Sequence, residues 1–326
     1  MKRITFFITL LLLAAMPYLA FAGELSQKEI QEQALADYGV TKEAMQQYHQ
    51  DFMTNVAEFQ EKLQAKIAKQ ASQPGFSQEK AMDIAMESMV EMGDVMRETS
   101  QKHFNEEQRQ KMQLRMFQML RSITDDAIKT DDPAAATITQ GTAPLELMMG
   151  PPDFLNLTEG QKKEIFDVQK ETTKAIQLTS QNVIQSNAKN PEGLKKFQEM
   201  QELAGKIQKA ETEEERQAIA QKLLAIHSEM FKDAAPEFKK ILKEGREKYD
   251  AVLTDAQRAK IKTVMEQIPE YLWQSLPQNQ GKNRSWRPGL NSWIPGMGAP
   301  KGTENIREAK PESKEKGRRF PGNNGT

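Results

Sequence analysis

The chain has 326 residues and carries 45 Lys and Arg against 46 Asp and Glu, a near balance that excludes the strong basicity typical of nucleic-acid-binding proteins. It has no cysteine, which excludes disulfides, thiolate metal sites and cysteine catalysis. Only 3 Trp, 5 Tyr and 14 Phe accompany 28% charged residues, and this composition favours exposed helical surface over the compact core of an α/β enzyme.

The first 22 residues have the pattern of an export signal. Lys2 and Arg3 precede an apolar run over residues 4–15, and Ala20-Phe21-Ala22 supplies the small residues of a cleavage site. The run is shorter than the roughly 20 apolar residues of a transmembrane helix, which disfavours an uncleaved anchor. We therefore expect a signal peptide over 1–22 and an exported, periplasmic or extracellular protein. Once the signal is removed, we expect no membrane span.

Residues 23–128 are expected to form a first block of helices. Apolar side chains recur there at intervals of three or four, which predicts helices over 26–38, 41–71, 77–100 and 105–128. Gly39 suits the end of the first helix, and Gln73-Pro74-Gly75 breaks the second.

Residues 129–153 are the predicted linker, because they contain four prolines and show no helical period. A second block over 154–276 follows, with helices over 158–188 and 192–209 and further helix starts at Thr212, Pro236 and Thr254. No segment has a convincing strand pattern. The predicted fold is therefore all-α, with helical hairpins in one or two elongated blocks.

The C-terminal tail, residues 277–326, is rich in Trp, Pro and Gly. From Gly281 onward it carries 10 basic and 4 acidic residues, a net charge of +6, and too little apolar surface to offset the entropy lost on ordering. We expect it to be disordered. Trp286 and Arg287 lie in one Ser-Trp-x-Pro-Gly repeat and Trp293 in the next, so the tail either docks onto a partner or folds back on the body.

Two of the predicted helices begin with the same pattern, Leu-Thr-x-x-Gln. The residues are Leu157, Thr158 and Gln161 in the first copy and Leu253, Thr254 and Gln257 in the second. The copies also agree at one Ile and one Val further along, and residues 104–108 form a looser third copy. Thr followed by Gln at the third helical position predicts a capping box, which stabilises any helix start by about 1 kcal/mol. Repeated capping is therefore one explanation of the pattern.

The other explanation is membership of a family in which this motif recurs. The paired motif in an exported, cysteine-free, helical and Met-rich chain resembles the Spy/CpxP-type periplasmic proteins, whose hallmark is a pair of Leu-Thr-x-x-Gln motifs. The resemblance implies an all-helical hairpin dimer with ATP-independent chaperone or envelope-stress activity, so that unfolded or envelope proteins would be its partners. Relatives that sense metals belong to the same group.

Methionines line two neighbouring helices at helical spacing. They are Met82, Met86, Met89, Met92 and Met96 on one helix and Met112, Met116 and Met119 on the next. Such a stripe is typical of an ordinary helix–helix core, but it also suits an adaptable surface for unfolded clients. A copper site built from thioethers is the third alternative.

No catalytic motif is recognisable, and we predict a non-enzymatic protein without a cofactor. Of the three histidines only His103, near Glu98 and Glu107, is a candidate metal ligand. The leading hypothesis is a chaperone that contacts clients through the methionine stripe. The alternatives are an envelope scaffold that docks through its tail and a metal-responsive sensor. Neither nucleic acid nor an integral membrane position is expected.

Overall fold

The computed structural model describes residues 27–71, 76–130, 133–207, 210 and 212–275. Within these ranges the chain is helical and contains no strand, which confirms the predicted all-α fold. The helices are α2 (Gln27–Tyr38), α3 (Lys42–Ala71), α4 (Gln78–His103), α5 (Glu106–Lys129), α6 (Pro133–Met149), α7 (Glu159–Ala188), α8 (Pro191–Ile207), α9 (Glu213–Phe231), α10 (Ala235–Val252), α11 (Asp255–Glu266) and α12 (Glu270–Ser275), with short 3-10 turns η1 (Asp153–Leu155) and η2 (Lys232–Ala234).

The helix starts follow from local capping chemistry. Ser77, Asn105, Thr158, Thr212 and Thr254 each precede a helix in extended conformation and accept a hydrogen bond from a backbone amide of its first turn. These are the positions at which the sequence predicts helices to begin. Local hydrogen bonding therefore sets these boundaries.

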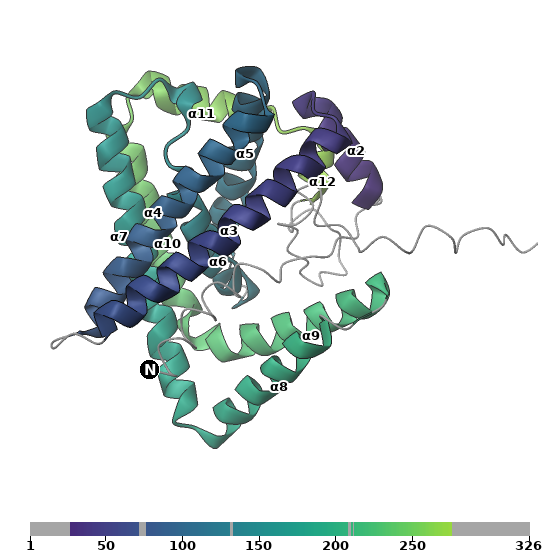
Figure 1. Cartoon of the computed structure of the whole chain (residues 1–326). Helices are drawn as coiled ribbons and strands as arrows, with labels where there is room; N and C mark the ends of the chain where they lie inside the picture. Colours follow the sequence, from purple (N-terminus) through teal and green to yellow (C-terminus); the bar gives the residue numbers. More distant parts are fainter. Residues whose placement is uncertain (1–26, 72–75, 131–132, 208–209, 211, 276–326) are drawn as a thin grey trace, which may run out of the picture.

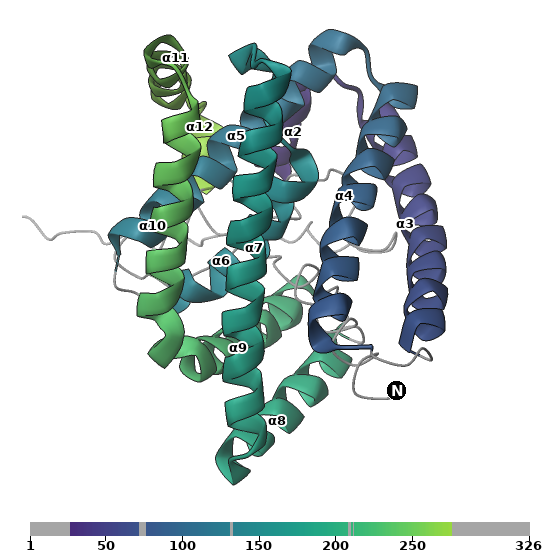
Figure 2. The same cartoon turned by 90° about the vertical axis from the view of Figure 1, so that its left-hand side faces the viewer.

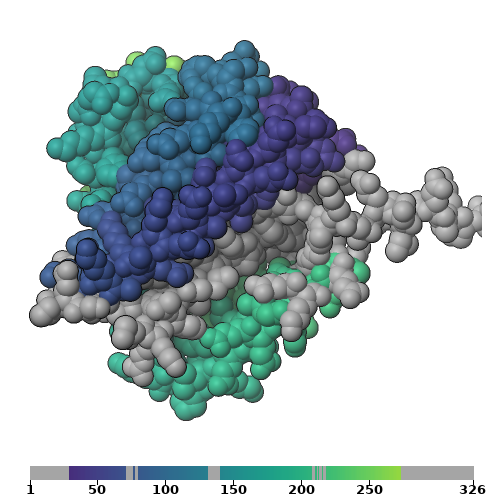
Figure 3. Space-filling model, viewed as in Figure 1, coloured from purple at the N-terminus to yellow at the C-terminus, as the bar shows by residue number. Residues whose placement is uncertain are grey.

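The helices pack largely as antiparallel neighbours. Helix α3 packs on α4, α7 on α10, and α8 on α9, and the α8–α9 hairpin extends away from the α3–α4 pair (Figures 1 and 2). In space-filling form α3 makes a ridge across the face seen in Figure 1 (Figure 3). No described helix is both long enough and apolar enough to span a bilayer.

The predicted linker over 129–153 is wrong. Most of it is helix α6, which contacts α4, α5, α7, α9 and α10 and so occupies the centre of the fold. Pro133 occupies the first position of the helix, where proline is tolerated, and Pro144 lies within it. Residues 141–144 are all buried. These four residues make one full turn, so this turn has no polar face and shows no helical period in its sequence.

Because α6 is central, one hydrophobic cluster draws residues from both predicted blocks. Ala127 and Ala143 from the first part of the chain pack with Ile176, Phe238 and Leu242 from the second. Helices α4 and α6 also approach closely at Gly93, where a Cβ atom would overlap the carbonyl oxygen of Met148. The described residues are therefore joined by side-chain packing across the expected boundary.

Candidate functional site

The two Leu-Thr-x-x-Gln segments both form complete capping boxes. The amide nitrogen of Gln161 donates to Thr158 Oγ1 (3.2 Å), and the Thr158 amide donates to Gln161 Oε1 (3.1 Å). The second copy repeats both bonds, with 3.3 Å from the Gln257 amide to Thr254 Oγ1 and 2.9 Å from the Thr254 amide to Gln257 Oε1. Each glutamine thus uses its side-chain oxygen to cap the start of its own helix.

The structure brings these two helix starts together. Gln161 Nε2 lies 2.9 Å from Gln257 Oε1, and Gln257 Nε2 lies 3.2 Å from Gln161 Oε1. The same two nitrogens also reach main-chain carbonyls, Val252 from Gln161 (2.9 Å) and Leu155 from Gln257 (3.3 Å). Each side-chain amide therefore caps its own helix with the oxygen and binds the other motif with the nitrogen.

Apolar residues of the two motifs form one cluster beneath this polar pair. Leu157 and Leu253 are buried there with Ile165 and Ile261, and Tyr249 completes the contact. The positions at which the two copies agree beyond the cap therefore include those that pack against each other. Capping alone would require only Thr and Gln, so the shared Leu and Ile reflect tertiary contact.

The looser third copy uses its glutamine in the same way. Asn105 and Gln108 form a capping box, and Gln108 Nε2 also donates to the carbonyl of Gly39 at the end of α2. Gly39 has a φ of +66°, a backbone conformation that favours glycine. A side-chain amide again joins its own helix start to another part of the chain.

The structure divides the methionine stripe into buried and half-buried members. Met82, Met86 and Met119 are at most 3% exposed and lie in core clusters, so in this conformation they offer no surface to a client. Of the three alternatives for the stripe, this favours a helix–helix core at these positions. The remaining candidates are only half-buried: Met89, Met96, Met112 and Met116.

His103 is paired with an acidic residue that the sequence does not suggest. Its Nε2 lies 2.9 Å from Asp51 Oδ2 on α3, and its ring lies near those of Tyr48 and Phe104. Nowhere in the described ranges do three or more His, Asp or Glu side chains gather at metal-binding spacing. The His103–Asp51 pair therefore joins α4 to α3, and a metal-binding role of His103 stays a prediction.

Exposed apolar surface is sparse among the described residues. Leu178 on α7 is 40% exposed and Leu194 on α8 is 47% exposed. The tail residues Trp286, Arg287 and Trp293, and the predicted signal peptide, lie outside the described residues. The described candidates for partner contact are thus these two leucines and the half-buried methionines.

Sequence reasoning missed a half-buried charge network between α5 and α10. Arg121 binds both carboxylate oxygens of Asp250 (3.1 and 3.0 Å), while Arg246 Nε lies 3.4 Å from Asp125 Oδ1. Burial alone would lower the pKa of Arg121, but its bond to Asp250 and the negative charges around it together outweigh burial and raise the pKa. The available signal is an Arg-x-x-x-Asp spacing on both helices, at 121–125 and 246–250. That spacing is common on solvated helices, where the pair bonds within one helix.

Comparisons with family models, with curated proteins and with solved structures find no match to this chain.

Proposed function

We propose that this protein is an exported, non-enzymatic binding protein that acts as an ATP-independent chaperone or envelope-stress protein of the Spy/CpxP type. The observation that carries the proposal is the reciprocal Gln161–Gln257 pair, because it makes the two Leu-Thr-x-x-Gln motifs one tertiary unit. Independent helix caps have no reason to meet. The motif pair is therefore more than repeated capping, and this supports the resemblance.

The client-binding surface would consist of the accessible apolar side chains rather than the buried methionines. Leu178 and Leu194 are exposed, and Met96 is half-buried on α4. Apolar contact with an unfolded segment removes surface from water on both sides, and flexible methionine adapts to different sequences. Residues 23–280 carry 33 basic and 42 acidic residues, a net charge of −9 that favours solubility.

The test is suppression of aggregation of a chemically denatured model protein by residues 23–326 without ATP. We expect suppression near stoichiometric ratios and a weaker effect in a variant with Leu178→Gln, Leu194→Gln and Met96→Gln. The matched control is Ala251→Gln with Ala259→Gln, which adds polar side chains at exposed positions outside the apolar set. If aggregation is not suppressed at a several-fold excess of this protein over the client, the proposal is wrong.

A second function, envelope scaffolding, is favoured by the composition of the tail. Its Trp-containing repeats and net charge of +6 suit docking onto an acidic partner. Deletion of residues 281–326 separates the two functions. A chaperone that works through the helical body keeps its activity after the deletion, whereas a scaffold loses its partner in pull-downs from envelope extracts.

A further inference from the structure

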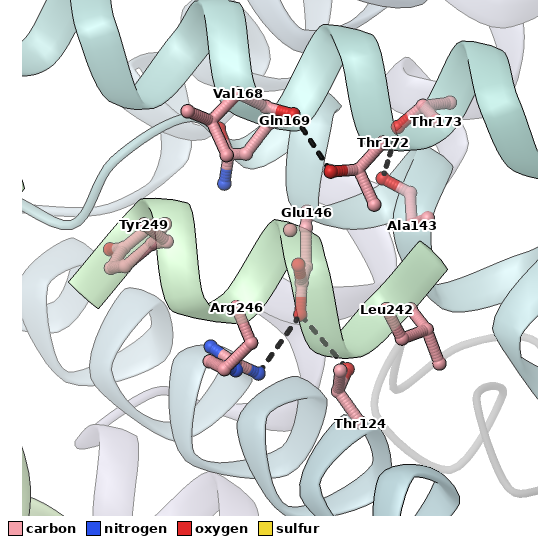
Figure 4. Close-up of a pocket in the computed structure, with 11 residues that line it drawn as sticks. Thr124, Ala143, Glu146, Val168, Gln169, Thr172, Thr173, Leu242, Arg246 and Tyr249 are labelled. Atoms are coloured by element: carbon pink, nitrogen blue, oxygen red, sulfur yellow. Dashed lines mark hydrogen bonds and ion pairs between the residues drawn. The ribbon is translucent and has the colours of Figure 1, made fainter. Parts of the chain in front are cut away.

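The pocket where α5, α6, α7 and α10 meet is too small for an organic ligand. It is partly open, but its volume is about 20 Å³ (Figure 4). A larger apolar surface lies at the contact between α2 and α12, the first and last described helices, which lie side by side in Figure 1. This surface is covered by the chain itself.

One face of α2 is completely buried. Ile30, Ala34 and Tyr38 follow one another at intervals of four, so they lie on the same side of the helix, and each is at most 3% exposed. Helix α2 packs on α5 and on α12. From α12, the consecutive residues Tyr271 and Leu272 join the same hydrophobic cluster, and Leu272 is fully buried. Two neighbouring side chains of α12 thus cover part of the apolar face of α2.

A polar pair at the edge of this face determines which residue fits there. The Tyr271 hydroxyl donates to Asp37 Oδ2 at 2.8 Å, and Arg115 holds the same carboxylate with bonds of 2.6 and 3.2 Å. The side chains of Asp37 and Arg115 are 25% and 15% exposed, so this pair lies between the core and the solvent. Because Phe lacks the hydroxyl, the edge favours Tyr.

Helix α12 is a short element at the end of the described chain. It has six residues, far fewer than an isolated helix needs to be stable, so it keeps its shape only while it is seated on α2. Residues 267–269 connect it to α11. The end of α11 is held separately, since Gln118 Nε2 donates to the Val264 carbonyl at 2.6 Å. Detachment of α12 would therefore expose the face of α2 and leave α11 in place.

We propose that this face of α2 is a docking site for a segment of a partner protein, and that α12 occupies the site in the free chain. The segment that fits is a short helix in which Tyr is followed by an aliphatic residue. Its hydroxyl donates to Asp37, and its aliphatic side chain takes the place of Leu272. The site is separate from the client surface proposed above and does not depend on chaperone activity.

The first test measures binding of a fluorescein-labelled peptide of residues 266–275 by fluorescence anisotropy. The receptor is the chain 23–326 with Tyr271→Ser and Leu272→Ser, in which α12 is released. We expect this variant to bind the peptide at least about tenfold more tightly than the parent, because the tethered α12 competes at a millimolar effective concentration. A peptide carrying Tyr271→Phe should bind about tenfold more weakly, since it loses the bond to Asp37.

The matched control chain carries Glu266→Ser and Gln267→Ser, at exposed positions just before α12. It should bind the peptide as weakly as the parent does. A released variant that keeps its helical circular dichroism but does not bind the peptide would overturn the proposal. So would a released variant that unfolds, because α12 would then be an inseparable part of the core. A dimer of the parent that dissociates in the released variant would make a second copy the occupant and overturn the assignment to another protein.

The second test uses the unaltered chain and follows hydrogen exchange. The amide of Leu272 donates to the Pro269 carbonyl at 3.0 Å, and its exchange reports the opening of α12. We expect it to exchange at least about 100-fold faster than the amide of the buried Leu120 in α5, because α12 opens locally while the bundle stays folded. Equal protection of the two amides would mean that α12 leaves only on global unfolding, and the docking site would be ruled out.

Discussion

Tyr271 donates a hydrogen bond of 2.8 Å to Asp37, so the last described helix is joined to the first. The same carboxylate accepts from Arg115 at 2.6 and 3.2 Å, which brings α2, α5 and α12 to one point. Burial alone would raise the pKa of Asp37, but the bonds from Arg115 and Tyr271 outweigh burial and lower it. The ionised form is therefore favoured by the fold.

The first prediction concerns acid stability. A carboxyl group with a lowered pKa in the folded state stabilises the protein above its unfolded pKa of about 3.9, and this contribution is lost as the pH falls through the native value. Asp37→Asn should reduce the free energy of unfolding at pH 7 by about 2 kcal/mol. The difference between the variant and the parent should shrink in urea titrations as the pH falls below the unfolded pKa. A difference that stays constant while the carboxyl groups become protonated would contradict the assignment.

The second prediction concerns the stability that the protein loses in mildly acidic solution because of His227. Burial lowers the pKa of His227 to about 4, and its ring stacks on Phe231 with centroids 4.4 Å apart. Between pH 6.5 and 4 the unfolded chain binds a proton that the folded chain does not, so stability falls as the pH falls. The loss of stability across this range is about 3 kcal/mol. His227→Phe keeps an aromatic ring and should flatten this part of the stability profile.

The third prediction separates capping from the contact between motifs. Gln161→Glu keeps an oxygen that accepts from the Thr158 amide but loses the nitrogen that binds Val252 and Gln257. It should cost about 1–2 kcal/mol although the helix start remains capped. The change to Ala removes both functions and should cost more. A double-mutant cycle of Gln161→Ala with Gln257→Ala, followed by urea unfolding, should give a coupling energy of at least about 0.5 kcal/mol. Additive losses would mean that the two glutamines act separately.

The fourth prediction compares two helical glycines. Gly93→Ala places a methyl group against the Met148 carbonyl and should destabilise the protein by about 2–3 kcal/mol, because α4 and α6 must separate. Gly205→Ala on α8 meets nothing within 4 Å and should stabilise it by about 0.5–1 kcal/mol through helix propensity. Thermal unfolding measures both changes. Equal changes in stability for Gly93→Ala and Gly205→Ala would show that α4 and α6 do not approach closely in solution.

Helix boundaries could be predicted from the sequence because they depend on neighbouring residues. Thr158, Thr254 and Asn105 fix their helix starts through bonds that span three positions. Helix α6 could not be predicted in this way. The turn at residues 141–144 is buried all round, which removes the polar–apolar alternation on which recognition of a surface helix depends.

The candidate site was visible in the sequence only as two separate motifs. That Gln161 binds Gln257 depends on how α7 and α11 are placed, which is a property of the whole fold. The same is true of Arg121, which binds Asp250 on α10 at 3.0–3.1 Å and Asp125 in its own helix only at 3.4 Å. Spacing along the chain identifies possible partners, and tertiary packing selects among them.

The central position of α6 and the long reach of the polar contacts have a consequence for biosynthesis. Arg121 meets Asp250 across 129 positions, and Asp37 meets Tyr271 across 234. A nascent chain that has emerged only as far as α6 has none of the α7 and α10 side chains that cover this helix. Long-range contacts form slowly and late. The N-terminal half should therefore remain accessible to proteases and chaperones until nearly all of the chain has been synthesised.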